Sequence, residues 1–250
     1  MKFFSISVFI FINIFVSHTY ADFKHSHEKW NQVLKQYTDK KDNQVYFNYK
    51  ELNKNQKLLN AYLLSLESIT QDEFDLFTQD QKIAFWINAY NAYTIKVVLK
   101  NYPVKSIRDI SSGWFSTGPW KIKFIKLLGN KVSLDNIEHD IIRKQFYEPR
   151  IHFAVNCASI GCPSLLQEAF VADKLDSQLD KAAQNFLHNK SKNYLKGNTL
   201  YLSKIFKWYG SDFNQGYGSF KKYVVKVLGL SNREYEVEFN EYDWNLNELK

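Results

Sequence analysis

The sequence contains little cysteine, proline or glycine. Its 250 residues include two cysteines, four prolines and nine glycines. There is no Pro/Gly/Ser-rich linker, no internal repeat and no low-complexity tract, so we expect a single domain. Hydrophobic residues make up 45% and aromatic residues 17% of the chain, which is enough apolar surface for a sizeable core.

Blocks of positive charge are also missing. The formal net charge of +7 comes from scattered lysines, which gives little support to nucleic-acid binding and leaves weak attraction to anionic surfaces possible. Only four positive residues are arginines: Arg108, Arg143, Arg150 and Arg233. In a chain that otherwise uses lysine, an arginine marks a position where its planar fork is needed.

Only one long hydrophobic run is present, at residues 3–16. It follows Lys2 and leads to Thr19-Tyr20-Ala21, with small residues at the −3 and −1 positions of a cleavage site. The run is shorter than the roughly 20 residues of a membrane-spanning helix. We therefore predict a signal peptide over residues 1–21 and an exported domain over 22–250, periplasmic or secreted. The alternative is an uncleaved anchor. A lipid anchor is not supported, because no cysteine stands at the cleavage point. No later stretch is expected to span a membrane.

Helical periodicity predicts a long buried helix over residues 78–100. Thr78 and Gln81 fit a capping box, and apolar residues occupy nearly every face of the helix. Asn88 and Asn91 lie three apart on it and project to one side. A buried amide needs hydrogen-bond partners, so these two residues hold a neighbouring loop or contact a polar side chain or a substrate.

The remaining pattern predicts an α+β fold: a helix-rich single domain with a small, mostly antiparallel sheet packed on the buried central helix. The other predicted helices cover residues 22–37, 53–69, 134–146 and 173–189, with a further helix opening at Cys162-Pro163; the predicted strands cover 44–50, 150–156, 198–206 and 234–242, with a hairpin over 119–134 that turns at Gly129-Asn130.

Both cysteines lie in the stretch "RIHFAVNCASIGCPSL", residues 150–165. Three interpretations are open. Cys157 and Cys162 could bind zinc with His152 and His139, although the spacing is not that of a structural site. They could form a disulfide, as the two cysteines of an exported protein usually do. Cys157 could instead be a nucleophile, activated by the N-terminus of the following helix.

A cysteine nucleophile also needs a base. In an extended strand His152 and Cys157 face opposite sides, which favours His139 of the preceding helix as the first choice and His152 as the second. An asparagine that orients the histidine would complete a Cys–His–Asn set suited to acyl transfer.

Five stretches of the chain carry a family resemblance: "AFWINAYNAYTI" (84–95), "SLDNIEHDIIR" (133–143), residues 150–165, "LSKIFKWYGSDF" (202–213) and "YDWNLN" (242–247). With these stretches the chain resembles the family catalogued as domain of unknown function 547. The resemblance implies no established activity. A buried helix beside a small sheet is similar to papain-type and transglutaminase-type folds, but a fold does not fix a function.

Together these features predict thiol-dependent acyl transfer or hydrolysis of an amide or ester. Cys157 would be the nucleophile and His139 the base. Asn88 or Asn91 would orient the histidine or hold an oxyanion. The predicted substrate-binding residues are Arg143, Trp208 and Asp212. The alternative is a binding or structural module in which a Cys157–Cys162 disulfide stabilises a site for a small molecule, a peptide or a glycan. No metal and no cofactor is expected.

Overall fold

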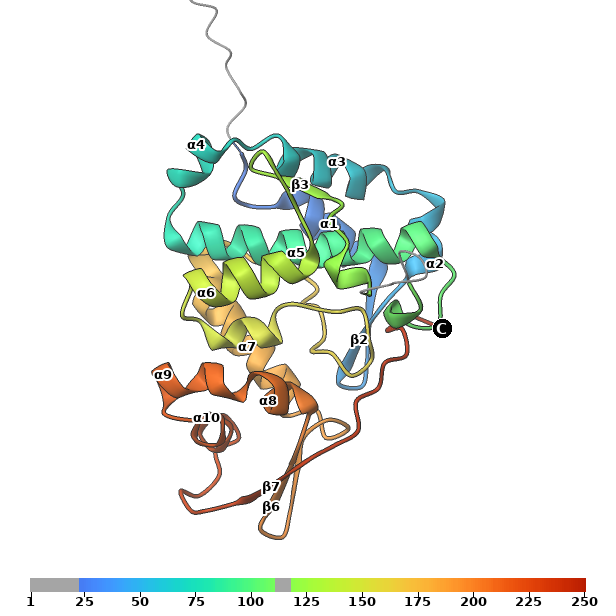
Figure 1. The fold of residues 1–250 in the computed structure, drawn as a ribbon. Helices are drawn as coiled ribbons and strands as arrows, with labels where there is room; N and C mark the ends of the chain where they lie inside the picture. The colour runs from blue at the N-terminus through green and yellow to red at the C-terminus, as the bar shows by residue number, and fades with distance from the viewer. Residues whose placement is uncertain (1–22, 111–117) are drawn as a thin grey trace, which may run out of the picture.

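The computed structural model describes residues 23–110 and 118–250 (Figure 1). The predicted signal peptide, residues 1–21, lies outside the described residues. The α-helices are α1 (Glu28–Tyr37), α2 (Tyr49–Lys54), α3 (Lys57–Glu67), α4 (Gln71–Asp75), α5 (Gln79–Asn101), α6 (Arg143–Gln145), α7 (Leu175–Leu187), α8 (Lys204–Tyr209), α9 (Asn214–Tyr217) and α10 (Phe220–Val227). The strands are β1 (Thr38–Lys41), β2 (Gln44–Phe47), β3 (Ile125–Leu127), β4 (Asn130–Val132), β5 (Tyr194–Lys196), β6 (Thr199–Leu202) and β7 (Glu236–Phe239).

Six short segments have tighter or wider helical turns. Those with 3₁₀ geometry are η1 (Ile107–Asp109), η2 (Pro119–Lys121), η4 (Pro149–Phe153), η5 (Ala172–Lys174) and η6 (Gly210–Phe213). The segment η3 (Asn136–Ile142) is a π-helix that runs into α6.

The central element is α5, which lies between α3 and α4 on one side and α6 and α7 on the other (Figure 1). Sixteen of its 23 residues are buried. It begins at the predicted capping box, in which the Thr78 and Gln81 side chains each accept a hydrogen bond from the other residue's backbone N–H. The prediction of a buried central helix is confirmed. No helix in the described part of the chain is long and apolar enough to cross a bilayer.

The two buried asparagines of α5 hold chain segments that lack regular structure. Asn91 donates to the carbonyl of Ala154 at 2.9 Å and accepts from the Asn156 N–H at 2.8 Å. Asn88 donates to the Phe170 carbonyl at 2.7 Å and accepts from the Phe170 N–H at 3.0 Å. Of the roles expected for these amides, the structural one, holding a neighbouring loop, is therefore confirmed.

The strands form three separate sheets. β1 pairs with β2 and β3 with β4 as antiparallel hairpins, and β6 lies between an antiparallel β5 and a parallel β7. The α+β class is confirmed, with small sheets in place of a single one. The β3–β4 turn falls at Leu128 and Gly129, one residue earlier than predicted, and both residues have positive φ.

The predicted strand at residues 150–156 is wrong. Residues 149–153 form η4, because Pro149 starts a helical turn and the Glu148 side chain accepts the Arg150 N–H at its beginning. An apolar, β-branched run becomes a strand only beside a pairing partner, and here none is adjacent. The helix predicted to open at Cys162-Pro163 is also wrong, since the next helical turn is η5 at Ala172.

The predicted helix over 134–146 is present, but its first part is a π-helix. Ser133 caps it, with its hydroxyl accepting the Asn136 N–H at 3.1 Å. The N–H of Arg143 bonds to the carbonyl of Glu138, five residues earlier. Single π-helical turns are rare and frequently lie at functional sites. The helices predicted over 22–37, 53–69 and 173–189 correspond to α1, α3 and α7.

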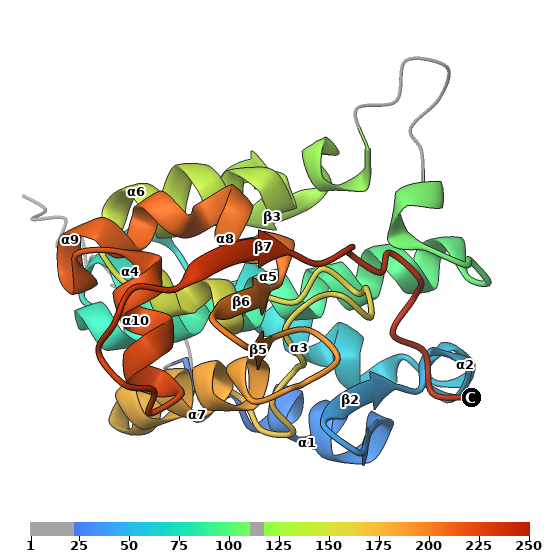
Figure 2. The ribbon, with the colours of Figure 1, turned by 90° about the horizontal axis from the view of Figure 1, so that it is seen from below.

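The C-terminal segment after β7 crosses the molecule to reach the region of α2 (Figure 2). On the way it bonds to the loop that holds the cysteines. The Gly161 N–H donates to the Asp243 carbonyl and the Ile160 N–H to the Asn245 carbonyl, both at 2.8 Å. The C-terminal segment is thereby joined to the middle of the chain beside the cysteines.

We predict that Asn91→Ala lowers the free energy of unfolding by about 1–3 kcal/mol, because a buried carbonyl and a buried N–H lose their partner. Denaturant titration of the purified protein measures this. Asn185→Ala on the exposed side of α7 is the matched control and should change stability by less than about 0.5 kcal/mol. Equal stability of Asn91→Ala and wild type would contradict the proposed anchoring role.

Candidate functional site

The two cysteines are joined in a disulfide, so the disulfide interpretation is confirmed for this structure. The described residues contain no free cysteine. We call residues 157–162 the cysteine loop. The Cys157 N–H donates to Cys162 Sγ at 2.9 Å, and Cys157 Sγ lies 3.2 Å from Ser159 Oγ and 3.3 Å from the Tyr242 hydroxyl. The thiol chemistry predicted for Cys157 thus requires reduction first.

The cysteine loop is held closely on the C-terminal segment. A side chain at Gly161 would place its Cβ 2.9 Å from both the Asp243 carbonyl and the Tyr242 ring, so only glycine fits there. Asn156 fixes both ends of the loop: its Nδ2 donates to the Pro163 carbonyl at 2.7 Å and its Oδ1 accepts the Ala158 N–H at 2.9 Å. These contacts set where the disulfide lies.

A buried lysine supports the same loop. The Lys192 ammonium donates to the Cys162 carbonyl. Burial lowers the pKa of Lys192 to about 7, opposed by the nearby charge of Asp243. The backbone carbonyl of Lys192 accepts a hydrogen bond from Asn240 at 2.9 Å, which ties the lysine to the chain after β7.

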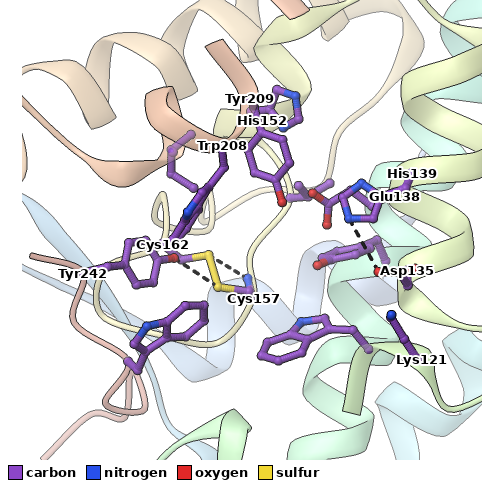
Figure 3. Close-up of a pocket in the computed structure, with 15 residues that line it drawn as sticks. Lys121, Asp135, Glu138, His139, His152, Cys157, Cys162, Trp208, Tyr209 and Tyr242 are labelled. Carbon is purple, nitrogen blue, oxygen red and sulfur yellow. Dashed lines mark hydrogen bonds and ion pairs between the residues drawn. A yellow bond between two sulfur atoms is a disulfide. The ribbon is translucent and has the colours of Figure 1, made fainter. Parts of the chain in front are cut away.

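Above the disulfide is a cavity of about 370 Å³, which we call the site cavity (Figure 3). Both cysteines form part of its lining. Aromatic rings make up much of the rest: Tyr90, Trp120, Trp208, Tyr209, Tyr242 and Trp244. These rings come from α5, η2, α8 and the C-terminal segment, so four distant parts of the sequence meet here.

The polar side of the cavity is formed by η3 and the residue before it. Asp135, Glu138 and His139 line the cavity from there, and Lys121 lines it from η2. The carboxylate of Glu138 lies close to the hydroxyls of Tyr90 and Tyr209. Burial, and next the negative charge of Glu138, raise the pKa of both tyrosines well above the usual range. The cavity therefore has aromatic walls and one largely anionic side.

His139 is held by its own helix. Its Nδ1 lies 3.2 Å from Nη1 of Arg143, and since arginine only donates, Nδ1 is the acceptor. Its Nε2 lies 3.6 Å from a carboxylate oxygen of Asp135. In the neutral ring the proton is thus on Nε2, facing Asp135.

Arg143 and Asp212 form a bidentate ion pair, with Nε and Nη2 each donating to one carboxylate oxygen at 2.7 and 2.8 Å. The guanidinium also lies 5.0 Å over the Tyr209 ring. Burial works to raise the pKa of Asp212, but hydrogen bonds from His152 and Arg143 outweigh it and hold that pKa well below its usual range. Asp212 is therefore ionised and compensates Arg143.

His152 belongs to the same network. Its ring is buried, stacks on Tyr209 with centroids 4.1 Å apart, and bonds through Nε2 to Asp212 at 2.8 Å. Burial lowers the pKa of His152, while the bond to Asp212 opposes this change. Its Nδ1 is buried without a hydrogen-bond partner in the described structure.

The structure brings Cys157, His139, His152 and Trp208 to one cavity, as the predicted site requires. It does not bring either histidine into hydrogen-bonding contact with Cys157. Figure 3 shows His139 and the sulfur atoms on different sides of the cavity, with Tyr209 and Glu138 between them. The catalytic assignments of these residues stay predictions.

Several parts of the predicted site take other partners. The helix N-terminus expected to activate Cys157 is absent, because no helix begins at Cys162. Asn88 and Asn91 bond to backbone, and the carboxylate held by Arg143 is that of Asp212. For the zinc interpretation, the described residues contain no group of three or more His, Cys, Asp or Glu side chains arranged to hold a metal ion.

Glu138 is one of the lining residues that were not predicted from the sequence. A signal for it exists: Leu134, Glu138 and Ile142 are spaced four apart, which places a carboxylate on the buried stripe of the helix. Tyr242 and Trp120 had no comparable signal, because their place in the cavity depends on tertiary contacts alone.

Residues 74–187 match the family model described as Protein of unknown function, DUF547. Over that stretch, which contains α5, η3 and the cysteine loop, the chain is similar to this family, in agreement with the resemblance found in the sequence. Stretches 202–213 and 242–247 lie outside the matched residues, although they contribute Trp208, Tyr209, Tyr242 and Trp244 to the cavity. Searches of curated proteins and of solved structures found no match.

The Asp212 network predicts how stability depends on pH. Because the folded-state pKa of Asp212 is depressed, its stabilisation is present above the unfolded value of about 3.9 and is lost as pH falls below it. The pKa of His152 is also depressed, so its protonation in the unfolded chain removes stability from about pH 6.5 downward.

Urea denaturation at pH 6, 5, 4 and 3 should therefore show Asp212→Asn less stable than wild type at pH 6, with a gap that narrows towards pH 3. Asp39→Asn, at an exposed position in β1, serves as the control and should follow the wild-type curve. A gap of constant size across the range would show that Asp212 does not act through its ionised form.

Proposed function

We propose that this protein is a ligand-binding module whose binding site is the site cavity, with the Cys157–Cys162 disulfide as a structural part of its floor. The observation that carries the proposal is an aromatic-walled cavity of about 370 Å³ with a few polar groups on one side. Ligand pockets typically have volumes of about 300–1,000 Å³, aromatic lining and a few polar groups that fix orientation.

The arrangement of the aromatic rings supports binding. Trp208 is 41% exposed, which is unusual for so large an apolar side chain. It contacts Tyr242 and Trp244, with ring centroids 4.9 and 5.9 Å apart. Aromatic residues of this kind supply a large contact area at a small cost in conformational entropy.

The disulfide fits this function and an extracytoplasmic location. Disulfides persist in oxidising compartments, and residues 1–21 have the pattern of a signal peptide. The proposal therefore includes export to the periplasm or the exterior.

The test of this function uses four probes: choline, its neutral isostere 3,3-dimethylbutan-1-ol, methyl glucoside and glycylglycine. We expect at least one of them to shift the indole N–H NMR signals of Trp208 and Trp244. The core tryptophans Trp30 and Trp86, 1% and 3% exposed, should not move. Trp208→Ala should weaken binding about ten-fold, since it removes a cavity wall.

Tyr147→Ala is the matched control, because Tyr147 is 77% exposed and lies outside the site cavity. It should bind the probe as wild type does. The proposal would be abandoned if no probe shifted these signals, or if Trp208→Ala bound as tightly as wild type.

A second candidate function is thiol-dependent acyl transfer or hydrolysis by the reduced protein. It is supported by the presence of Cys157 and His139 in the lining of one cavity. Cys157 is partly exposed, whereas Cys162 is 3% exposed. Reduction would therefore leave one accessible thiol beside the bound ligand.

Alkylation tests the state of the thiols. Iodoacetamide should modify neither cysteine in untreated protein, because both sulfurs are bonded. After reduction it should modify Cys157 several-fold faster than Cys162, as peptide mass spectrometry will measure, and Cys162→Ser should react at Cys157 without reductant. Rapid modification of the untreated protein would show that the pair is not a stable disulfide.

A further inference from the structure

Glu138 is a carboxylate buried without a cationic partner. Glu138 is 8% exposed and lines the site cavity from η3. No lysine, arginine or histidine nitrogen of the described chain forms an ion pair with it, although ten other ion pairs are present. Burial of a charge is costly unless the charge is paired, so this position favours a positive partner supplied from outside the chain.

The neighbouring polar groups have partners of their own. Arg143 is neutralised by the bidentate contact with Asp212, and Asp135 lies 3.6 Å from Nε2 of His139. Lys121 is the remaining cationic residue of the lining. It is exposed, and its ammonium forms no ion pair with Glu138 in the described structure. Arg143 and His152 feel the charge of Glu138 but form their ion pairs with Asp212, so Glu138 has no direct ion-pair partner among the described residues.

The walls of the cavity are made of groups that attract cations. The face of an aromatic ring carries negative charge density, which attracts a cation placed above it. Two guanidinium groups of the chain already use this wall: Arg108 lies 5.1 Å from the ring of Trp244 and Arg143 lies 5.0 Å from that of Tyr209. Trp208, Tyr242 and Trp244 all line the cavity, and the rings of Tyr242 and Trp244 are tilted by 52° to each other.

We infer that the site cavity binds its ligand through a cationic head group, an amine or a quaternary ammonium, with Glu138 as the counter-ion and Trp208, Tyr242 and Trp244 as the aromatic wall. This inference rests on the proposed binding function and names its ligand class. A neutral sugar or peptide would stack on the rings but would leave the charge of Glu138 uncompensated. A compact cation satisfies both the carboxylate and the rings.

Calorimetric titration of the full disulfide-bonded protein with choline and with 3,3-dimethylbutan-1-ol tests the inference. The two probes have nearly the same shape and differ in charge. We expect choline to bind at least about ten-fold more tightly to wild type. Glu138→Gln should reduce this preference to about two-fold or less, because it keeps the shape of the side chain and removes the charge.

Asp140→Asn removes a charge from the same helix at an exposed position that pairs with Lys144, so it controls for net charge and should keep the wild-type preference. Trp208→Leu, at a half-exposed position, provides an independent readout if Glu138→Gln does not fold. It should weaken choline binding about three-fold or more and change the affinity for the neutral probe less.

The outcomes separate the two proposals. Equal affinity of wild type for both probes, or an unchanged preference in Glu138→Gln, overturns the cationic ligand class and leaves the binding function standing. Absence of binding by either of these probes, and by methyl glucoside and glycylglycine, overturns both.

Discussion

Hydrogen bonds from one buried amide, that of Asn91 in α5, set the position of the chain that leads into the cysteine loop. Residues 154–171 contain no regular element, so no helix or sheet ladder can hold them. Their place is fixed instead by side chains that reach their backbone: Asn91 at 154 and 156, Asn156 at 158 and 163, Lys192 at 162 and Asn88 at 170. A loop that depends on several buried polar contacts is rigid when all are satisfied and unstable when one is lost. The disulfide adds a covalent bond to a conformation that is already determined in this way.

The same contacts explain which elements the sequence could predict and which it could not. Helices such as α5 and α7 repeat a period within one stretch, and that period is visible without knowledge of the fold. The stretch 150–156 has the composition of a strand, but composition does not say whether a partner strand is adjacent, and here Pro149 and Glu148 start a 3₁₀ turn. The polar cluster around Arg143 was expected, whereas its pairing with Asp212, 69 residues later, depends on tertiary packing alone. The burial of Glu138 could have been predicted, since its spacing from Leu134 and Ile142 places it on the buried stripe of the helix.

The site contains one group of charged side chains that are paired with each other and one carboxylate, Glu138, that has no ion-pair partner. Arg143, Asp212, His152 and Tyr209 form a closed set in which each charge has a partner, and the depressed pKa of Asp212 is a consequence of that closure. Glu138, on the same helix as Arg143, lies close to two tyrosine hydroxyls but forms no ion pair among the described residues. The π-helical geometry of η3 places it there, with an N–H to carbonyl bond spanning five residues in place of four. Buried polar groups in proteins are nearly always paired within the structure. Glu138, which has no ion-pair partner, is therefore a better candidate for contact with a ligand than the Arg143–Asp212 pair.

Binding and thiol chemistry make different demands on this arrangement. The proposed binding site uses aromatic walls and a carboxylate that already line the cavity. A nucleophilic Cys157 needs the disulfide reduced and a base brought to the sulfur. For His139 this means giving up the bond from Arg143, and a hydrogen bond to a charged group contributes about 1.5–3 kcal/mol. For His152 it means leaving Asp212 and the Tyr209 ring, which would also leave Asp212 with one fewer donor. The catalytic alternative thus requires a rearrangement of bonded side chains, whereas the proposed binding site uses side chains in the positions that the described structure gives them.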